Sequence, residues 1–362
     1  MKSCWYRLRN CRRRGNGSSI SADSPNPRTV YKPGGGVIRA KIAGTGSYIP
    51  EKVATNFDLE KFLDTSDEWI VSRTGIRERH IAAECQNASD LATEAARKAL
   101  EMAGVAAEEI DLIIVGTITG EFTFPSAACM VQKNLGARRA VAFDVSAACS
   151  GFIFALANAV NYHRIGTVKR SLVIGSEIMT RTVNWKDRNT CVLFGDGAGA
   201  VVLSSEEGEG GILSTHLHTD GNYWELLYQL SGSASPSFLP EVEDQGRRFV
   251  KMQGNEVFKV AVKALSDVAL EALAANGLTK DDLKLIFPHQ ANKRILDAIG
   301  KRLDLPSDKI FVNVDRVANT SSASIPIALD EANRRGLLAP QDLILLNAFG
   351  GGFTWGAALI RW

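Results

Sequence analysis

The sequence has little of several features that would assign it to other classes of protein. No apolar run approaches the roughly 20 residues needed to cross a bilayer, which predicts a soluble protein. Lys and Arg (42) nearly balance Asp and Glu (40), and a net charge of +2 is too small to indicate nucleic acid as a partner. No C-x-x-C pair occurs, and the 5 histidines do not cluster at metal-ligand spacing, so we expect no metal site.

What the sequence does contain is typical of a globular protein. At 362 residues and 45% hydrophobic, the chain is long enough to bury one large core or two fused cores. Its cysteines, 6 in number, are scattered, and no secretory apolar segment accompanies them. This pattern predicts a reducing, cytoplasmic environment in which one thiol can serve as a nucleophile.

Residues 1–37 differ in composition from the rest of the chain. They contain many arginines and several serines but a single acid, Asp23. Such a leader fits an organelle transit peptide, for instance one directed to a plastid. The alternative is a disordered extension translated from an upstream start, with Val37 as the true first codon. We favour this alternative because the segment lacks a clean amphipathic helix.

The remaining chain repeats itself. Residues 100–114 and 273–287 both read as a helix end, a glycine stop, an acidic pair and a buried strand. Further matches follow in the same order, pairing 141–145 with 310–314, 171–175 with 342–346, and 194–203 with 353–361. This indicates an internal duplication. We therefore predict two α/β halves, 38–207 and 208–362, with mixed or parallel sheets covered by helices.

Cys149 is the candidate nucleophile. A predicted strand ends at about Val145, small residues make a tight turn, and an apolar helix follows through Phe152 and Val160. A thiol at a helix N-terminus is close to unpaired N–H groups, which favour the thiolate. The alternative, a small buried hydrophobe, is the usual state of a free cysteine. We expect that state for Cys129 and Cys191, which lack the strand–turn–helix context.

Two residues of the second half are candidate partners of Cys149. His289 follows a predicted buried strand and precedes a helix, a position that faces the ligand crevice in such sheets. Taken alone, it could equally be a structural histidine bonded to the backbone. Asn319 lies in a turn that aligns with the Cys149 turn in the repeat, although it could simply cap the next helix. The glycine turn 349–353 offers backbone N–H groups for an oxyanion.

From Ala40 to Trp362 the chain closely resembles the β-ketoacyl-acyl carrier protein synthase III family of initiating condensing enzymes in type II fatty acid synthesis. The segments that carry the resemblance are GTGSYIPE, DTSDEWIVSRTGIRERHIAA, FDVSAACSGF, FGDGAGAVVLSS, GNEVFKVAV, HQANKRI, NTSSASIP and AFGGGFTWGAALIRW. The resemblance implies a thiolase fold, a duplicated five-layer αβαβα arrangement. It also implies a homodimer, substrates rather than a cofactor in the site, and no metal.

The family also implies a role for each candidate. Cys149 would take the acetyl group from acetyl-CoA, or another short acyl group from its CoA thioester. His289 and Asn319 would bind the carbonyl of malonyl-acyl carrier protein during its decarboxylation, and the backbone N–H groups of Cys149 and Gly351 would form the oxyanion hole. The product would be acetoacetyl-acyl carrier protein.

The resemblance further assigns binding surfaces. Coenzyme A contacts are implied for Thr65, Trp69, Arg73, Arg188, Gly254, Asn255, Phe258, Ala291 and Asn292. Phe349 and, across the dimer interface, Phe124 would line the acyl pocket. A basic surface of Lys259, Arg294, Lys301 and Arg302 would bind the acidic carrier protein. Read without the family, Trp69 would be a core aromatic and these charges an ordinary solvated surface.

Several related functions stay open. A thiolase would need a second cysteine near the C-terminal glycine turn, and an elongating synthase would need a second histidine, whereas plant-type polyketide synthases share Cys–His–Asn but have a different loop. A related enzyme using a branched, longer or aromatic primer remains the main alternative, since residues 231–248 match poorly. A non-catalytic scaffold or thiol sensor is a further one. Other departures are Val317-Ala318, where many relatives have a glycine, and Ser322, where alanine is common.

Overall fold

The computed structural model describes residues 38–230 and 249–362. The leader at 1–37 and the poorly matching segment 231–248 lie outside the described residues. Residues 36–362 form one compact unit. Within the described ranges, no helix is long and apolar enough to cross a membrane.

Two large sheets have the same strand order, one in each half of the sequence. In the first, the order is β1 (Ile38–Tyr48), β7 (Asp196–Glu207), β6 (Arg170–Ile178), β4 (Leu112–Gly116) and β5 (Val141–Val145). In the second, it is β8 (Gly211–Thr219), β13 (Thr354–Arg361), β12 (Leu343–Gly350) and β11 (Leu285–Pro288). Each sheet begins with two antiparallel pairings and continues with parallel ones. The duplication predicted from the sequence is therefore present in the topology.

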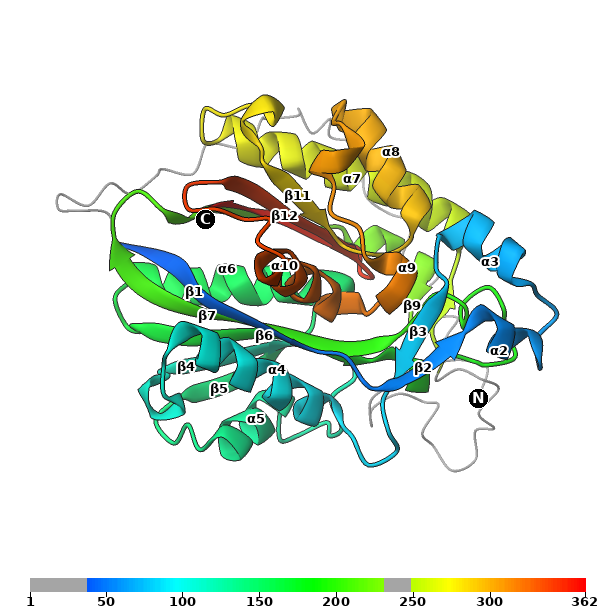
Figure 1. Cartoon of the computed structure of the whole chain (residues 1–362), viewed down its shortest axis with the longest axis horizontal. Helices are drawn as coiled ribbons and strands as arrows, with labels where there is room; N and C mark the ends of the chain where they lie inside the picture. The colour runs from blue at the N-terminus through cyan, green and yellow to red at the C-terminus, as the bar shows by residue number, and fades with distance from the viewer. Residues whose placement is uncertain (1–37, 231–248) are drawn as a thin grey trace, which may run out of the picture. The chain divides into compact units, whose positions relative to one another are not determined.

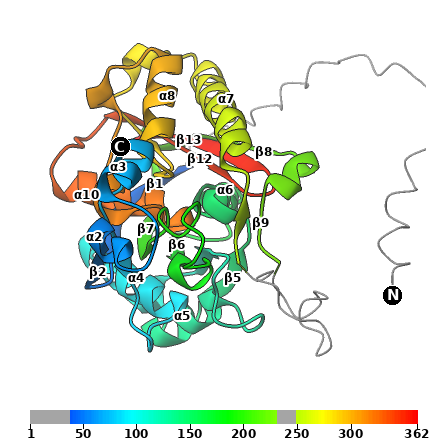
Figure 2. The same cartoon turned by 90° about the vertical axis from the view of Figure 1, so that its right-hand side faces the viewer.

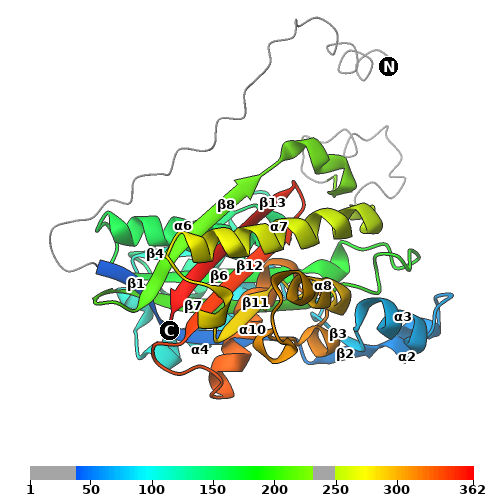
Figure 3. The same cartoon turned by 90° about the horizontal axis from the view of Figure 1, so that it is seen from above.

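Helices cover the two sheets so that five layers result (Figure 1). Helices α4 (Ala88–Ala103) and α5 (Ala127–Leu135) cover the outer face of the first sheet, and α7 (Gly254–Ala274) and α8 (Lys293–Leu303) the outer face of the second. Helices α6 (Gly151–Arg164) and α10 (Ser324–Arg334) lie between the sheets. Figure 2 shows the two outer helical layers on opposite sides, and Figure 3 shows α7 and α8 above the second sheet. The predicted αβαβα arrangement is confirmed.

Smaller elements lie at one end of these layers. They are the hairpin of β2 (Lys52–Thr55) and β3 (Glu78–Ile81), the short pair β9 (Leu227–Tyr228) and β10 (Lys251–Met252), and the helices α2 (Asn56–Glu60), α3 (Asp67–Thr74) and α9 (Val314–Val317). Local sequence explains where several helices begin and end. Ser126 caps α5 by accepting the N–H of Cys129, and Gly136 ends it with a φ of 74°, which a residue without a side chain adopts at little cost.

Three apolar clusters hold the layers together. The first contains α6 and α10 side chains such as Phe152 and Leu329, packed between the sheets. The second joins α4 to the outer face of the first sheet, and the third joins α7 and α8 to the second sheet. Because α6 has a sheet on each side, it is apolar around most of its circumference, unlike α8, whose exposed side carries charges. Helix α10 is apolar in its first two turns and carries Asp330 and Arg334 towards its end.

Residues 310–314, which match β5 in the repeat, do not form a full strand. Only a single parallel bridge joins Ile310 to Ile286 of β11. Beyond it, the buried side chain of Gln290 replaces a backbone partner: its amide nitrogen donates to the carbonyl of Phe311 at 3.1 Å, and its oxygen accepts the N–H of Asn313 at 3.0 Å. The backbone of this edge segment therefore bonds to a side chain and not to a neighbouring strand. The strand propensity of the sequence does not reveal this.

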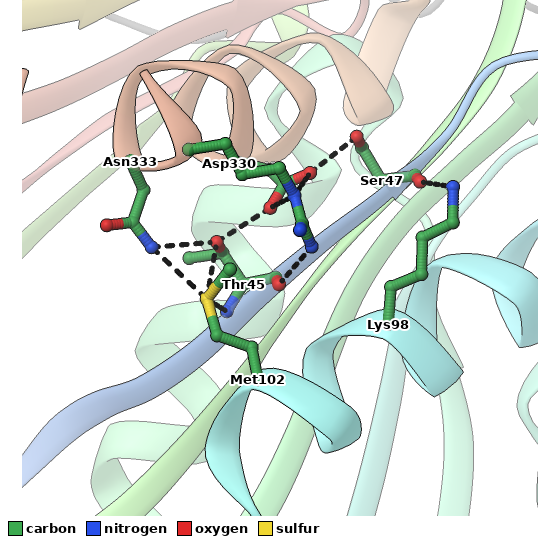
Figure 4. Close-up of polar contacts among 7 residues, drawn as sticks. Thr45, Ser47, Lys98, Met102, Asp330 and Asn333 are labelled. Atoms are coloured by element: carbon green, nitrogen blue, oxygen red, sulfur yellow. Dashed lines mark hydrogen bonds and ion pairs between the residues drawn. The ribbon is translucent and has the colours of Figure 1, made fainter. Parts of the chain in front are cut away.

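A polar cluster connects the two halves around Asp330 of α10 (Figure 4). The carboxylate, almost fully buried, accepts the hydroxyls of Thr45 at 2.7 Å and Ser47 at 2.6 Å, both from β1. Arg334 of the same helix pairs with it at 2.9 Å. Lys98 of α4 donates to the carbonyl of Ser47 at 2.8 Å. With its charge paired and hydrogen-bonded, the buried Asp330 holds β1 to the central helix of the other half.

Candidate active site

A cavity of about 1270 Å³ opens at the carboxyl ends of the parallel strands and is lined by residues of both halves. Cys149 comes from the first half, and His289 and Asn319 come from the second. Gly351 also lines it. The structure therefore brings together the three residues that sequence analysis selected for catalysis. In the described part of the chain, no cluster of His, Cys, Asp or Glu could hold a metal ion.

Cys149 lies in a sharp turn between β5 and α6. The single-turn helix η2 (Ala148–Ser150) holds it, and Ala148 before it takes a φ of 46°, in the left-handed region. The end of β12 approaches this turn so closely that a Cβ added to Gly350 would meet the backbone nitrogen of Cys149 at 2.7 Å. A glycine is required there because any side chain would push the thiol turn away from the glycine turn.

The expected low pKa of the Cys149 thiol is wrong for the protein without substrate. Burial raises its pKa to about 12, the nearby Glu177 carboxylate raises it further, and hydrogen bonds from Ser321 and from the backbone offset only part of this. Desolvation disfavours the thiolate by more than the start of α6 favours it. Cys149 therefore meets its substrate as a neutral thiol.

His289 is almost fully buried at the end of β11, and burial lowers its pKa to about 3. Its ring is neutral at physiological pH because charging it would require hydration that the site does not provide. Its Nδ1 lies 2.7 Å from the hydroxyl oxygen of Ser324, which also accepts the N–H of Gln290 at 3.4 Å. The Ser324 hydroxyl proton is thus free to bond Nδ1. That assignment leaves the proton of the neutral ring on Nε2, as a hydrogen-bond donor.

Asn319 has the capping role that the sequence left open, and it also lines the cavity. Its side-chain oxygen accepts the N–H of Ser321 at 2.9 Å, which is the capping role. Its backbone is held between Leu193 and Gly195, with bonds of 2.9 and 3.1 Å. Because the oxygen is engaged, the amide N–H groups are the ones available to a molecule in the cavity.

The two sequence departures near Asn319 have visible consequences. Ala318 takes a φ of 57° with a ψ of −162°, a conformation that suits glycine and strains an alanine. Ser322 is fully used: its hydroxyl oxygen lies 2.6 Å from the carbonyl oxygen of Gly116 and 3.0 Å from a carboxyl oxygen of Glu177. An alanine at 322 would remove both contacts.

Sequence analysis missed Glu177. This carboxyl group is completely buried on β6, and burial raises its pKa to about 7. It acts electrostatically on the Cys149 thiol. The only signal in the sequence was one acidic residue inside the otherwise uncharged strand 171–178. A buried, perturbed carboxyl beside a cavity is a feature of functional sites.

At the mouth of the cavity, Trp69 lies between two guanidinium groups. The guanidinium carbons of Arg73 and Arg188 are 4.6 and 5.0 Å from the centre of its ring. Trp69 is half-buried: it packs against a small apolar cluster that includes Ile70 and Val192, and it also contacts the charged groups. The other predicted coenzyme A contacts that line the cavity are Gly254, Asn255, Phe258, Ala291 and Asn292.

The remaining predicted residues divide into two groups. Phe349, Lys259 and Arg294 line the cavity, and Phe349 packs against Phe353 with ring centres 4.7 Å apart. Thr65, Phe124, Lys301 and Arg302 do not line it. Phe124 is 84% exposed, and Arg302 pairs with Asp267 at 3.2 Å. Arg294 and Lys301 are exposed on α8, while Ile295, Ile299 and Leu303 pack inward.

The other cysteines differ from each other. Cys191 is fully buried, as expected. Cys129, expected in the core, is exposed. On α5 the buried positions are Ala127, Ala128 and Val131, so Cys129 falls on the opposite side of the helix, where its sulfur accepts the hydroxyl of Ser126 at 3.2 Å. The helix period, rather than the residue type, decided its exposure.

Comparison with known proteins gives a consistent result. Family models match at residues 143–221 (3-oxoacyl-[acyl-carrier-protein] synthase III) and 273–362 (its C-terminal part). The chain is 59% identical over 325 residues to β-ketoacyl-[acyl-carrier-protein] synthase III of Xanthomonas campestris pv. campestris, covering 90% of this chain and 99% of the relative.

Solved structures agree. 3-Oxoacyl-[acyl-carrier-protein] synthase III from Aquifex aeolicus VF5 matches with a TM-score of 0.84 at 48% identity, covering 89% of this chain and 100% of the other. The priming β-ketosynthase from the R1128 polyketide biosynthetic pathway matches with a TM-score of 0.83 at 36% identity, covering 91% and 98%. The predicted thiolase fold is confirmed. On this evidence the chain belongs to the 3-oxoacyl-[acyl-carrier-protein] synthase III family.

Proposed function

We propose that this protein starts fatty acid synthesis by condensing acetyl-CoA with malonyl-acyl carrier protein, through an acetyl group held on Cys149. The observation that carries the proposal is the convergence of Cys149, His289 and Asn319 on one cavity from opposite halves of the duplicated fold. Membership of the synthase III family gives the reaction class. The proposed chemistry uses no cofactor, because each step is an exchange between thioesters or a loss of CO₂.

In the first half-reaction, the sulfur of Cys149 attacks the acetyl thioester carbonyl. A new carbon–sulfur bond forms, the bond to coenzyme A breaks, and the thiol proton ends on the coenzyme A sulfur. The exchange is neutral in charge, which suits a buried thiol whose pKa is raised to about 12. Backbone N–H groups of Cys149 and Gly351 form the proposed oxyanion hole for the tetrahedral intermediate.

In the second half-reaction, malonyl-acyl carrier protein loses CO₂. The carbon–carbon bond breaks, and its electron pair forms an enolate on the thioester. Neutral His289 donates from Nε2 and Asn319 from its amide nitrogen to the enolate oxygen, where charge develops. The enolate carbon then attacks the acetyl carbonyl, and the carbon–sulfur bond breaks as acetoacetyl-acyl carrier protein forms. Cys149 leaves as a thiolate and takes up one proton from solvent, which restores the neutral thiol. Because the ring of His289 is neutral, it stabilises the enolate oxygen by a hydrogen bond, and no carboxylate is needed beside it to balance a positive charge.

Coenzyme A is proposed to bind at the mouth of the cavity. Arg73 and Arg188 supply positive charge for its phosphates, and the indole of Trp69 offers a stacking surface for adenine. In the unliganded protein the guanidinium groups lie against the indole, so adenine stacking requires one of them to move. Arg188 also donates to the backbone carbonyl of Asp64, which leaves Arg73 as the less constrained of the two.

The primer is the least determined part of this proposal, and a second candidate function concerns it. Likeness to a priming β-ketosynthase of a polyketide pathway supports, as the alternative, a related condensing enzyme with a branched, longer or aromatic acyl-CoA primer. The test is a comparison of initial rates across acetyl-, branched and aromatic acyl-CoA with malonyl-acyl carrier protein. A clear preference for acetyl-CoA supports initiation of fatty acid synthesis, and a preference for a larger primer replaces it with the second function.

The proposed compartment is the cytoplasm. The cysteines in the described residues, Cys85, Cys129, Cys149 and Cys191, are free thiols. Free thiols of which one is catalytic suit a reducing compartment.

We also propose that the protein works as a homodimer joined at β5. This strand is the last of its sheet, and apolar side chains are exposed on and near it: Val141 by 62%, Phe122 by 54% and Phe124 by 84%. An edge strand with an apolar surface is a template for pairing with a second chain. Phe124 would then reach the acyl pocket of the partner subunit.

Val141→Lys is expected to weaken the dimer roughly hundredfold, because the symmetric interface would receive two buried like charges. Leu270→Lys is the matched control: Leu270 is 51% exposed on α7, in the opposite outer layer. Sedimentation velocity measures both. The β5 interface is supported if Val141→Lys is a monomer while Leu270→Lys is still a dimer. It is excluded if Val141→Lys is as dimeric as the wild type.

The proposed carrier-protein surface is the basic side of α8. Arg294 and Lys301 are exposed there, whereas Lys259 and Arg302 are paired with Glu256 and Asp267. The first two charges therefore offer the larger attraction to an acidic partner, because paired charges contribute little. We expect the other two to matter less.

Arg294→Glu and Lys301→Glu are expected to raise the KM for malonyl-acyl carrier protein about tenfold and to reduce its salt dependence, because reversed charges repel an acidic partner. Acetyl transfer from acetyl-CoA should stay nearly unchanged in Lys301→Glu, because Lys301 does not line the cavity. Lys284→Glu, an exposed reversal just before β11 and away from the cavity, is the control. Equal losses in both half-reactions would contradict the docking role.

A further inference from the structure

Glu177 and Ser321 form a buried polar connection to Cys149. One carboxyl oxygen of Glu177 is surrounded by donors from the loop after β4: the hydroxyls of Thr117 and Thr119, at 3.3 and 2.5 Å, and the N–H of Ile118, at 3.2 Å. The other oxygen faces the hydroxyl of Ser321, at 3.2 Å. One oxygen is thus saturated with donors, and the other is open to a change in protonation.

A proton on Glu177 therefore sits on the oxygen that faces η8 (Ser321–Ala323), where the serine hydroxyls lie. Ser322 can accept that proton, since its own hydroxyl has the carbonyl oxygen of Gly116 as an acceptor at 2.6 Å. Ser321 has one hydroxyl proton and two possible acceptors. One is Glu177, at 3.2 Å. The other is the sulfur of Cys149: the turn η2 that carries it packs against η8, both residues line the cavity, and the Ser321 side chain lowers the pKa of the thiol.

We propose that Glu177 and Ser321 are positioning residues that set the reactivity of Cys149: when Glu177 is protonated, the Ser321 hydroxyl turns from the carboxyl to the sulfur. An ionised Glu177 disfavours the thiolate in two ways. It attracts the Ser321 hydroxyl away, and its negative charge repels the developing charge on sulfur. Protonation removes both. The inference rests on the proposed role of Cys149 as the nucleophile.

The surroundings of Glu177 support this arrangement. Within the described residues, Cys149 is the ionisable group whose pKa Glu177 raises. Asp196, next along β7, directs its carboxylate to Thr180 and to the N–H of Ala82 instead. Burial raises the pKa of Glu177 to about 7, so its protonation changes within the physiological range. The φ of Ser321, 51°, and its N–H bond to Asn319 hold the hydroxyl in place.

The test is the pH dependence of Cys149 alkylation by iodoacetamide, with the modified peptide identified by mass spectrometry. Glu177→Gln is expected to lower the pH midpoint of alkylation by about one unit, because the side chain is then neutral at every pH. Ser321→Ala is expected to raise the midpoint by about one unit, because the thiolate loses a donor. Opposite shifts cannot arise from a common folding defect.

Controls separate this inference from the proposed function. Ser322→Ala removes a hydroxyl from the same carboxyl oxygen without touching the sulfur, so its midpoint should stay near that of the wild type. Exposed Cys129 in the same samples reports any general change in reagent reactivity. Suppose that acetyl-CoA acetylates wild-type Cys149, but that Glu177→Gln and Ser321→Ala shift the midpoint in the same direction or not at all. The inference about Glu177 and Ser321 then fails, while the proposed function stands. If wild-type Cys149 is never acetylated, the proposed function fails as well.

Discussion

Replacing Cys149 with serine is expected to reduce acetyl transfer from acetyl-CoA by about 10³-fold or more. A serine hydroxyl is a far weaker acid than a thiol, and burial, which already raises the pKa of Cys149 to about 12, would make an alkoxide still less accessible. The replacement is nearly isosteric, so the tight turn at η2 should survive. The loss would then be one of nucleophilicity and not of structure.

The measurement is the mass of the protein after exposure to acetyl-CoA. The wild type should gain one acetyl group, located on Cys149 by peptide mapping, and Cys149→Ser should gain none. Cys129→Ser makes the same chemical change at an exposed cysteine and should acetylate normally. Acetylation found on Cys129 or Cys191 in the wild type would overturn the assignment of the nucleophile.

His289→Ala and Asn319→Ala are each expected to slow the decarboxylation of malonyl-acyl carrier protein by about 10²–10³-fold while acetylation of Cys149 continues. Each variant removes one donor from the oxygen that gains charge when CO₂ leaves. The two half-reactions differ in this respect because the acetyl transfer places its oxyanion on backbone N–H groups. Release of labelled CO₂ and acetylation by mass spectrometry measure the two steps separately.

The direction of pH dependence adds a further check on His289. Burial lowers its pKa to about 3, so the ring stays a neutral donor from pH 5 to 8. The rate of decarboxylation should therefore not fall in that range through protonation of His289. The unfolded chain has a histidine pKa near 6.5 and binds the extra proton first. Stability therefore falls as the pH drops from about 6.5 towards 3, and His289→Ala should make this fall less steep. Normal decarboxylation by both alanine variants would exclude the enolate-binding role.

Two features explain why the site needs both halves of the duplication. The first half presents Cys149 at the end of β5, and the second presents His289 at the end of β11, which occupies the position of β4 in the corresponding sheet order. Carboxyl ends of parallel strands meet at one edge, so duplicating the fold places two such edges face to face. One copy holds the acyl group, and the other contributes the proposed donors for its reaction partner.

The sequence alone determined what depends on local pattern. The order of strands and helices, the internal duplication, the turn that carries Cys149 and the apolar face of α8 all follow from hydrophobic period and turn residues within short segments. His289 and Asn319 were selected by their place after a strand and in the matching turn of the second copy. Their place at the cavity could be predicted because strand ends and turns are specified by neighbouring residues, and their catalytic roles stay predictions.

Only the tertiary structure decided properties that depend on burial and on partners distant in the chain. Glu177 belongs to the site because Ser321 and Ser322, about 145 residues away, fold against it. The thiol of Cys149 has a raised pKa because both halves exclude water from it, and residues 310–314 form only a bridge because Gln290 takes the place of a strand. Desolvation and long-range hydrogen bonding act between segments that no local pattern connects, and they set the chemistry of groups whose positions the local pattern had already indicated.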